Sequence, residues 1–168
     1  MAKSKLGLGK ILMGVAALLG IVAIVMMFAP HLSAAEGKIT YSGMDVTFGH
    51  SETQLGITLK IFNFSFLNLL AYILVLVGVV FTVLAMFGKL GKISSFVAMA
   101  AFVVGGILFF LVIQGTSPNV GEASGELADK IIEEIKKTFS LGIGAIMAGI
   151  ASILAGVATA LATFMFKN

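Results

Sequence analysis

Residues 67–113 read LNLLAYILVLVGVVFTVLAMFGKLGKISSFVAMAAFVVGGILFFLVI, and this stretch decides the fold. Its charged side chains are Lys89 and Lys92, which lie in a short turn between two apolar runs. A helix needs about 20 apolar residues to cross the hydrocarbon core of a bilayer. Each run is therefore long enough for one crossing. The turn is so short that it predicts two antiparallel, neighbouring helices.

The same pattern extends over the rest of the chain. Of its 168 residues, 59% are hydrophobic and 11% are charged, whereas about 25% are charged in ordinary soluble domains. This composition excludes a soluble enzyme, a nucleic-acid-binding domain and a disordered chain. We therefore expect one all-α membrane domain over residues 1–168, built as a four-transmembrane-helix bundle. The predicted spans lie within four runs that lack Asp, Glu, Lys and Arg, and they cover residues 11–29, 67–87, 95–113 and 141–166.

The charged residues that remain predict which side of the membrane each segment occupies. The chain ends and the turn carry six lysines and no acid, while the other two connecting segments carry five lysines and all eight acids. The formal charges of the two sides are therefore +6 and −3. Because basic residues favour the cytoplasmic side, both termini and the turn are predicted to be cytoplasmic in a multi-pass protein of the cell (plasma) membrane. The basic residues are all Lys, which argues against a nucleic-acid partner.

The first span also carries features of a signal peptide. Basic residues precede its apolar run, and Ser33-Ala34-Ala35 matches a small-residue cleavage site. The apolar run from Ile11 to Ala29 is longer than a usual signal core. We therefore expect the segment to be retained as a span, with cleavage within residues 1–35 as the alternative.

The first outer segment, residues 30–66, has the alternating pattern of β-strands. Polar and apolar residues alternate from Ile39, the phase slips by one residue after Gly43, and alternation resumes from Leu55 after a polar turn at 49–54. The pattern predicts an extracytoplasmic β-hairpin with a bulge at Gly43. An isolated hairpin is marginally stable, so we expect it to lie on the bundle, on the second outer segment or on a neighbouring copy. The predicted contact or core residues of this sheet are Tyr41, Met44, Val46, Phe48 and Ile57.

The second outer segment predicts a short amphipathic outer helix over residues 124–140. Leu127, Ile131, Ile135 and Phe139 recur at four-residue steps, and Ser124 is a candidate N-cap. We expect this helix to cover the top of the bundle. The alternative is contact with a membrane surface or a partner.

Small residues follow two rows along the fourth predicted span. Such rows allow close helix packing in lipid, where the hydrophobic effect does not drive helices together. One interpretation is packing within the bundle, and the other is that one row faces a second protomer. The first row is Ala148, Ser152, Gly156 and Ala160, and the second is Ala151, Ala155, Thr159 and Thr163.

Residues that carry chemistry are few. The cores of the predicted spans hold no ionisable side chain, although proton relays and many coupled transporters need one. The chain has no Cys and no recognised catalytic motif. His31 and His50 are the two histidines, and with Glu36, Asp45 or Glu52 they could hold a divalent cation, but the spacing matches no recognised site. We therefore predict no catalytic, cofactor-binding or metal site.

The order of segments resembles that of the claudin and peripheral-myelin type of four-span protein. In that order a longer outer β-segment follows the first span, a short inner turn joins the second and third, and a shorter outer segment precedes the fourth. The claudin signature of Trp residues and a Cys pair is absent here. The chain also looks like small, lysine-rich, uncharacterised four-span proteins of Gram-positive bacteria. The resemblance implies a bundle that presents a small sheet outward for assembly.

These observations predict a non-enzymatic membrane protein that mediates assembly or protein–protein interaction through its outward hairpin. Its expected partners, besides the lipid bilayer, are further copies in a homo-oligomer or another membrane protein. The alternative is a small oligomeric channel or an accessory subunit of a larger transporter complex.

Overall fold

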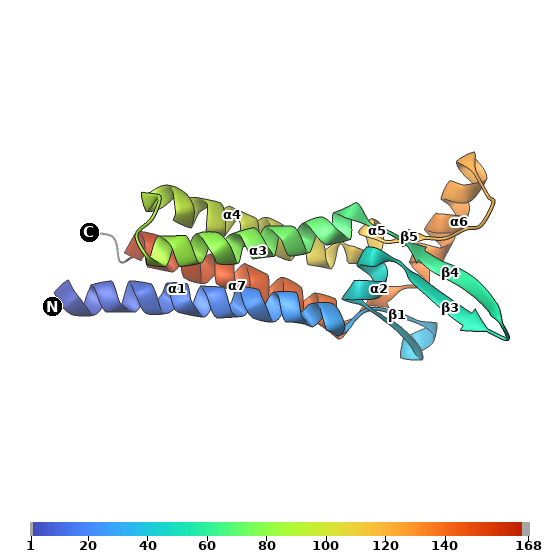
Figure 1. The fold of residues 1–168 in the computed structure, drawn as a ribbon, viewed down its shortest axis with the longest axis horizontal. Coiled ribbons are helices and arrows are strands. Elements are labelled where there is room, and N and C mark those ends of the chain that lie inside the picture. The colour runs from blue at the N-terminus through green and yellow to red at the C-terminus, as the bar shows by residue number, and fades with distance from the viewer. Residues whose placement is uncertain (1, 166–168) are drawn as a thin grey trace.

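Four long helices lie side by side in an elongated bundle, as the computed structural model of residues 2–165 shows (Figure 1). They are α1 (Ala2–Val25), α3 (Phe66–Met86), α4 (Gly91–Phe110) and α7 (Ile143–Met165). Helix α1 packs against α3 and α7, and α4 packs against the same two helices from the opposite corner. All four helices are long and apolar enough to cross a membrane, so the predicted bundle of four membrane-length helices is present.

Helix α3 agrees with its predicted span to within one residue at each end, whereas the other helices differ more. Helix α1 begins at Ala2 and ends at Val25, where a 3-10 turn, Met26–Phe28, follows, and α4 begins at Gly91 rather than at residue 95. Helix α4 ends at Phe110, and a separate single-turn helix, α5 (Val112–Gly115), follows after Leu111. The break places Val112 in a buried position among the outer elements rather than in the third span. Helix α7 begins at Ile143 rather than at residue 141, and the last predicted residue of its span, 166, lies outside the described residues.

Large apolar side chains are on the outside of the bundle, and small ones are on the inside. Alanines at the helix contacts are buried, whereas many Leu, Ile, Val and Phe side chains on the same helices are exposed; Val75, Phe102 and Phe109 are buried exceptions. This is the reverse of a soluble bundle, and it suits a lipid environment, where close backbone approach drives helix association. On α7 the exposed row is Met147, Ile150, Leu154, Val157, Leu161 and Phe164.

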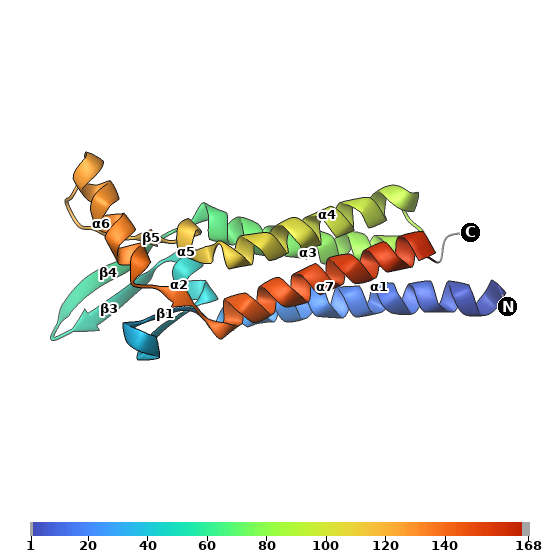
Figure 2. The same cartoon turned by 180° about the vertical axis from the view of Figure 1, so that it is seen from behind.

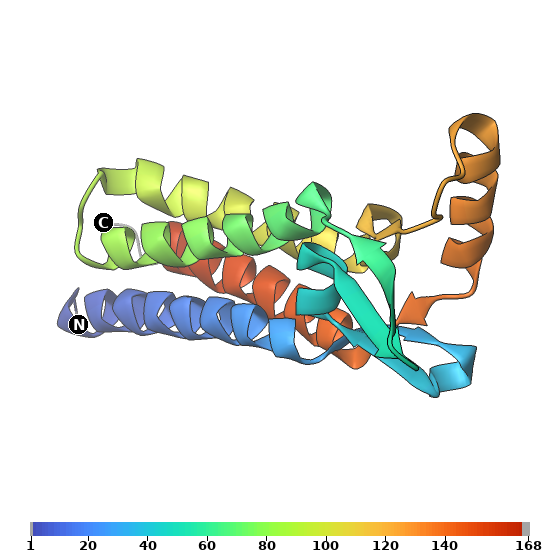
Figure 3. The same ribbon diagram turned by 45° about the vertical axis from the view of Figure 1, so that its right-hand side comes forward.

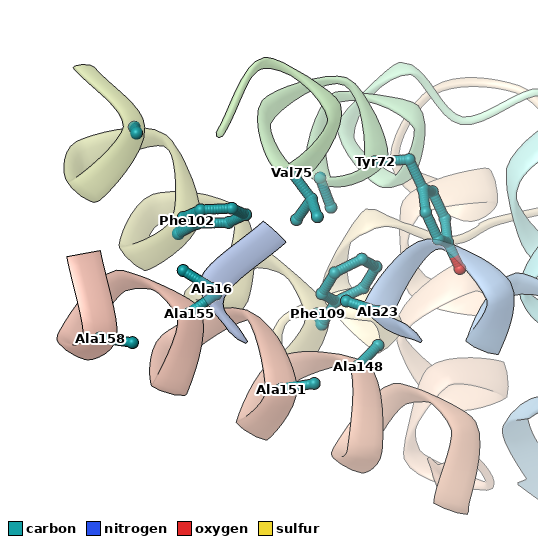
Figure 4. Packing of buried hydrophobic residues seen from close by; sticks show 12 residues of the cluster. Ala16, Ala23, Tyr72, Val75, Phe102, Phe109, Ala148, Ala151, Ala155 and Ala158 are labelled. Atoms are coloured by element: carbon teal, nitrogen blue, oxygen red, sulfur yellow. The ribbon is translucent and has the colours of Figure 1, made fainter. Parts of the chain in front are cut away.

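The Phe102 ring is one of three aromatic rings buried in the core of the bundle, with Tyr72 and Phe109. Phe102 of α4 is fully buried, and Figure 4 shows its ring in the interior with Ala16 and Ala155. Glycines make the space for it, because a Cβ at Gly20 or Gly78 would lie 2.7 Å from the Phe102 ring. The Phe102 backbone carbonyl also accepts a 2.7 Å hydrogen bond from Ser152 Oγ of α7. One residue thus joins α4 to the three other long helices.

Charged residues separate by the end of the bundle at which they lie. All eight acids are on segments that connect α1 to α3 or α4 to α7, and these segments gather at one end (Figure 2). Lys10 lies towards the other end, with the α3–α4 turn that carries Lys89. The arrangement agrees with the charge separation read from the sequence.

The predicted two-stranded hairpin over residues 39–64 is wrong in its first half. Residues Gly43–Phe48, expected as a strand after a bulge, form the short helix α2. The Ser42 side chain accepts from the Asp45 N–H at 3.2 Å, and Asp45 Oδ2 accepts from the Ser42 N–H at 2.9 Å. This reciprocal capping box starts a helix, and its two hydrogen bonds outweigh the strand-like alternation of the segment.

The outer segments form two three-stranded sheets in place of one hairpin. The strands are short and antiparallel, and each sheet takes its third strand from the segment before or after α6. One sheet has the order β2-β1-β6, from Ile39–Ser42, Pro30–Ala34 and Ser140–Leu141. The other has the order β3-β4-β5, from His50–Gln54, Ile57–Asn63 and Ser117–Pro118. The polar residues 49–54, expected as a turn, thus supply a strand.

The amphipathic helix α6 (Gly125–Lys137) forms as predicted, but it does not cover the bundle. It has no buried residue, Leu127 is 62% exposed, and the helix stands away from the long helices beyond β5 (Figure 3). Ser124 occupies the N-cap position without a side-chain hydrogen bond. Lys136 joins α6 to the short helix α5, because its Nζ donates to the Gln114 carbonyl at 2.7 Å.

Candidate interaction surface at the outer end

The β3–β4 hairpin is the most extended feature of the outer end. Its strands pair from Gln54↔Ile57 to Ser51↔Lys60, and a bulge follows between Ser51 and His50. Beyond the bulge, His50 pairs with Phe62, which is buried. The bulged end of the hairpin is therefore anchored in the fold, while its tip projects away from the bundle (Figure 1).

The tip of the hairpin is a two-residue turn, Leu55-Gly56, in which both residues have positive φ. The angles are +52° at Leu55 and +80° at Gly56. Turns of this kind prefer Asn-Gly, because a side chain with Cβ is strained at positive φ. Leu55 is nevertheless a leucine, and it is fully exposed at 103%. Neither local backbone preference nor packing within residues 2–165 accounts for leucine at this position.

One face of the hairpin carries two further apolar side chains next to the tip. Ile57 and Leu59 lie on the same face of β4 and are 63% and 58% exposed. Their cross-strand neighbours on that face are Gln54 and Glu52 of β3. With Leu55 they form the hairpin tip patch, which we define as Leu55, Ile57 and Leu59.

Strand β3 is the edge of its sheet. Its partner within the sheet is β4 alone, so alternate N–H and C=O groups of residues 50–54 point outward. An edge strand of this kind can pair with a strand of another chain. The edge and the hairpin tip patch are adjacent and form one continuous surface.

A polar cluster holds the anchored end of β3 against the neighbouring elements. His50 Nδ1 lies 2.9 Å from Asp45 Oδ1 of α2, and its Nε2 lies 3.6 Å from Glu52 Oε1. The Tyr41 ring of β2 meets the His50 ring edge-on with 5.8 Å between centroids. Partial burial, with the nearby Glu52 and Asp45 carboxylates, raises the pKa of Tyr41. The cluster joins the two sheets to α2 and fixes the direction in which the hairpin leaves the fold.

His31 lies at the junction between the outer elements and the bundle. It is the extra residue in a bulge of β1, and its side chain is fully buried. Its Nδ1 lies 3.0 Å from the Ala29 carbonyl, which can only accept, so Nδ1 carries the hydrogen. Nε2 is then free to accept the 2.7 Å hydrogen bond from the Tyr72 hydroxyl. Burial lowers the pKa of His31, and the Ala29 hydrogen bond opposes this in part.

Asn68 forms a second joint between the bundle and the outer elements. Its Nδ2 donates to the Val46 carbonyl of α2 at 3.0 Å and to Thr116 Oγ1 at 3.3 Å. One turn earlier, Ser65 Oγ donates to the Gly115 carbonyl. These buried bonds connect the start of α3 to both outer segments, so the base below the hairpin is rigid.

The residues predicted for the hairpin surface do not share one surface. Val46 is fully buried in a small outer core, and the Tyr41 ring packs edge-on against Phe62 with 4.7 Å between centroids. Met44 and Phe48 are exposed, but on α2 rather than on a strand. Ile57 alone of the five lies on the hairpin tip patch. The role of these residues in binding stays a prediction.

Both rows of small residues on α7 are covered within the chain. Ala148, Ser152 and Gly156 of the first row are buried, and Ala160 is half-buried. In the second row Ala151, Ala155 and Thr159 are buried, and Thr163 is half-buried. The helix lies between α1 and α4, which explains why it needs two small faces rather than one.

Leu55 was missed by the sequence reading. The sequence pattern predicts Leu55 as the first residue of a strand, because leucine followed by alternating residues fits a strand. The available signal was the pair Leu55-Gly56, which stands where a hairpin turn prefers Asn-Gly.

The comparisons with known proteins and the search for metal-binding groups gave no match. Within residues 2–165, no group of three or more His, Asp or Glu side chains is arranged to hold a metal ion. No known family model, curated protein or solved structure matches the chain. The chain is therefore described by its own features: four membrane-length apolar helices with a small two-sheet region at one end.

Proposed function

We propose that this chain is a non-enzymatic membrane protein that assembles with further copies of itself through the β3–β4 hairpin. In this proposal the four long helices cross the plasma membrane, and both termini are cytoplasmic. The exposed apolar belt of the bundle and its small-residue interior support the membrane placement. The charged residues of the turn at one end are lysines, and the acids lie at the other end. This separation supports the cytoplasmic placement of the termini and the turn. The resemblance to the claudin type stays a prediction.

The observation that carries the assembly function is Leu55. A fully exposed leucine at positive φ costs backbone energy and gains nothing in the isolated chain. Strain held at a surface position is a reason to propose a function there. Leu55 would be covered when the hairpin meets a partner, together with Ile57 and Leu59.

A second copy is the partner that the edge strand fits best. An antiparallel pair of β3 strands related by a twofold axis satisfies the outward N–H and C=O groups of both strands at once. Each copy then contributes the same hairpin tip patch to the contact.

Cysteine cross-linking tests the pairing directly, because the natural chain has no Cys. Single variants Ser51→Cys, Glu52→Cys and Thr53→Cys place one thiol along the edge strand. In a twofold pair the residue nearest the axis faces its own copy, with Cβ atoms about 4.5–5.5 Å apart. We expect one of the three variants to form a disulfide-linked dimer on mild oxidation in membranes, and its neighbours to do so less.

The control is Asp129→Cys on the exposed helix α6, which should stay monomeric under the same oxidation. A second arm adds Leu55→Asn to the variant that cross-links, and the dimer band should weaken because the exposed leucine at the hairpin tip is lost from the contact. Equal cross-linking of all four single variants, or of none, would show that β3 is not the interface.

A further inference from the structure

The end of the bundle opposite the sheets contains a cavity with a positive charge at its edge. Its volume is about 390 Å³, and it lies between α1, the end of α3 and α7. Sites for small molecules span about 300–1,000 Å³, so the cavity is large enough for a headgroup-sized ligand. Its lining includes Lys10 and Met13 of α1, Ala85 and Gly88 near the end of α3, and Ala162 of α7.

Lys10 is the charged residue of this lining. Its side chain is exposed, and no hydrogen bond or ion pair within residues 2–165 engages its amine. All eight Asp and Glu side chains lie at the other end of the bundle, so none of these side chains is placed to neutralise it. Lys89 follows Gly88 directly and adds a second cation close to the cavity. The site therefore favours an occupant with negative charge.

The rest of the lining is apolar and continues along the helices. Met13 lies one helical turn from Lys10, in the direction of the belt of exposed Leu, Ile and Val, and Met86 and Ala162 form the other walls. A ligand that suits both parts has an anionic group for Lys10 and a hydrocarbon portion for the walls. A free anion would leave the apolar walls without a partner.

We propose that this cavity binds the headgroup of an anionic phospholipid of the cytoplasmic leaflet. Its phosphate lies against the Lys10 amine, and its glycerol and upper acyl carbons lie along Met13 and Ala162. The proposal rests on the membrane placement argued above, and it is independent of the hairpin contact. Lys10 is the last cation before the first apolar run. A lysine at this position lies near the membrane surface, where its side chain can reach lipid phosphates.

Native mass spectrometry of the purified full chain in non-ionic detergent tests the site. The probes are phosphatidylglycerol and phosphatidylcholine with identical acyl chains, offered at equal concentration. We expect preferential retention of phosphatidylglycerol by the natural chain. Lys10→Gln should reduce that retention by about five-fold, the effect of one lysine near an anionic lipid surface. Lys10→Glu should remove the preference altogether.

Two further variants separate the site from general charge and from unfolding. Lys38→Gln removes an exposed cation at the sheet end and should retain phosphatidylglycerol as the natural chain does. Ala85→Phe fills the cavity while it keeps every charge, and it should lower retention as Lys10→Gln does, with an unchanged helical circular dichroism spectrum.

Three results would overturn the proposal. One is equal retention of the two lipids by the natural chain, and another is an equal loss in Lys10→Gln and Lys38→Gln. The third is complete displacement of phosphatidylglycerol by millimolar inorganic phosphate, which would assign the site to a soluble anion. None of these results bears on the cross-linking of β3, so the two proposals fail separately.

Discussion

Replacing Leu55 by Asn should stabilise the fold and weaken assembly at the same time. A residue with Cβ in the left-handed region costs roughly 1–2 kcal/mol, and Asn tolerates that region better than Leu. Leu55 is fully exposed in the single chain, so the change removes no packing. We therefore expect Leu55→Asn to raise the free energy of unfolding by about 1 kcal/mol. Denaturant titration followed by circular dichroism measures it.

The same substitution should raise the dissociation constant of the dimer. Covering one leucine contributes about 1.5–3 kcal/mol, and each 1.4 kcal/mol is a factor of about ten in affinity. We therefore expect at least a ten-fold weaker dimer, as measured by analytical ultracentrifugation in detergent.

Leu90→Asn is the matched control for this prediction. Leu90 also has positive φ, at +61°, and is 62% exposed, but it lies in the turn at the other end of the bundle. It should stabilise the fold by a similar amount and leave the dimer unchanged. If Leu55→Asn destabilises the chain, or if both variants have the same effect on association, the reasoning from backbone strain to an interface is refuted.

Three further predictions concern the core and the junction. Burial lowers the pKa of His31, so its neutral form contributes stability above pH 6.5. This contribution should decline as the pH falls from 6.5 towards the lowered pKa. His31→Gln should flatten that part of the stability–pH profile, as measured by thermal unfolding. Gly78→Ala should cost about 1–3 kcal/mol, because its Cβ would lie 2.7 Å from the Phe102 ring. Gly14→Ala in α1 has open space, so it should be unchanged or more stable by up to about 1 kcal/mol in the same denaturant titration. Asn68→Ala should cost about 1–3 kcal/mol and increase amide hydrogen exchange in α2, because it removes a buried donor and leaves the acceptor unsatisfied.

The sequence was enough to predict the four long helices. A run of about 20 residues without charges directly indicates a helix that can cross a bilayer, because an unpaired charge in lipid costs free energy. The boundary at Leu111 could not be read, since no proline or charge marks it. The apolar residues at four-residue steps in α6 correctly predicted a helix. The same spacing also suggested that its apolar face packs on the bundle, but Leu127 is exposed.

The outer sheets were harder to predict because their strands are short and depend on distant partners. Strand β1 lacks a clear alternation, and it becomes a strand because β2 and β6 pair with both of its edges. Asp45 three residues after Ser42 was a visible capping signal, and it competed with a strand pattern in the same residues. The proposed surface lies within the segment that the sequence predicts to be a hairpin. Its central residue, Leu55, stands out through its positive φ, which the strand-like alternation around it does not indicate.

Labelling of single cysteines in intact cells tests the central claim most directly. In the proposed topology α6 lies on the outer face of the membrane, and the α3–α4 turn lies in the cytoplasm. A membrane-impermeant maleimide should therefore modify Glu126→Cys in intact cells, and should modify Lys89→Cys after the membrane has been permeabilised. Equal labelling of the two variants in intact cells would contradict a bundle that crosses the membrane in this way.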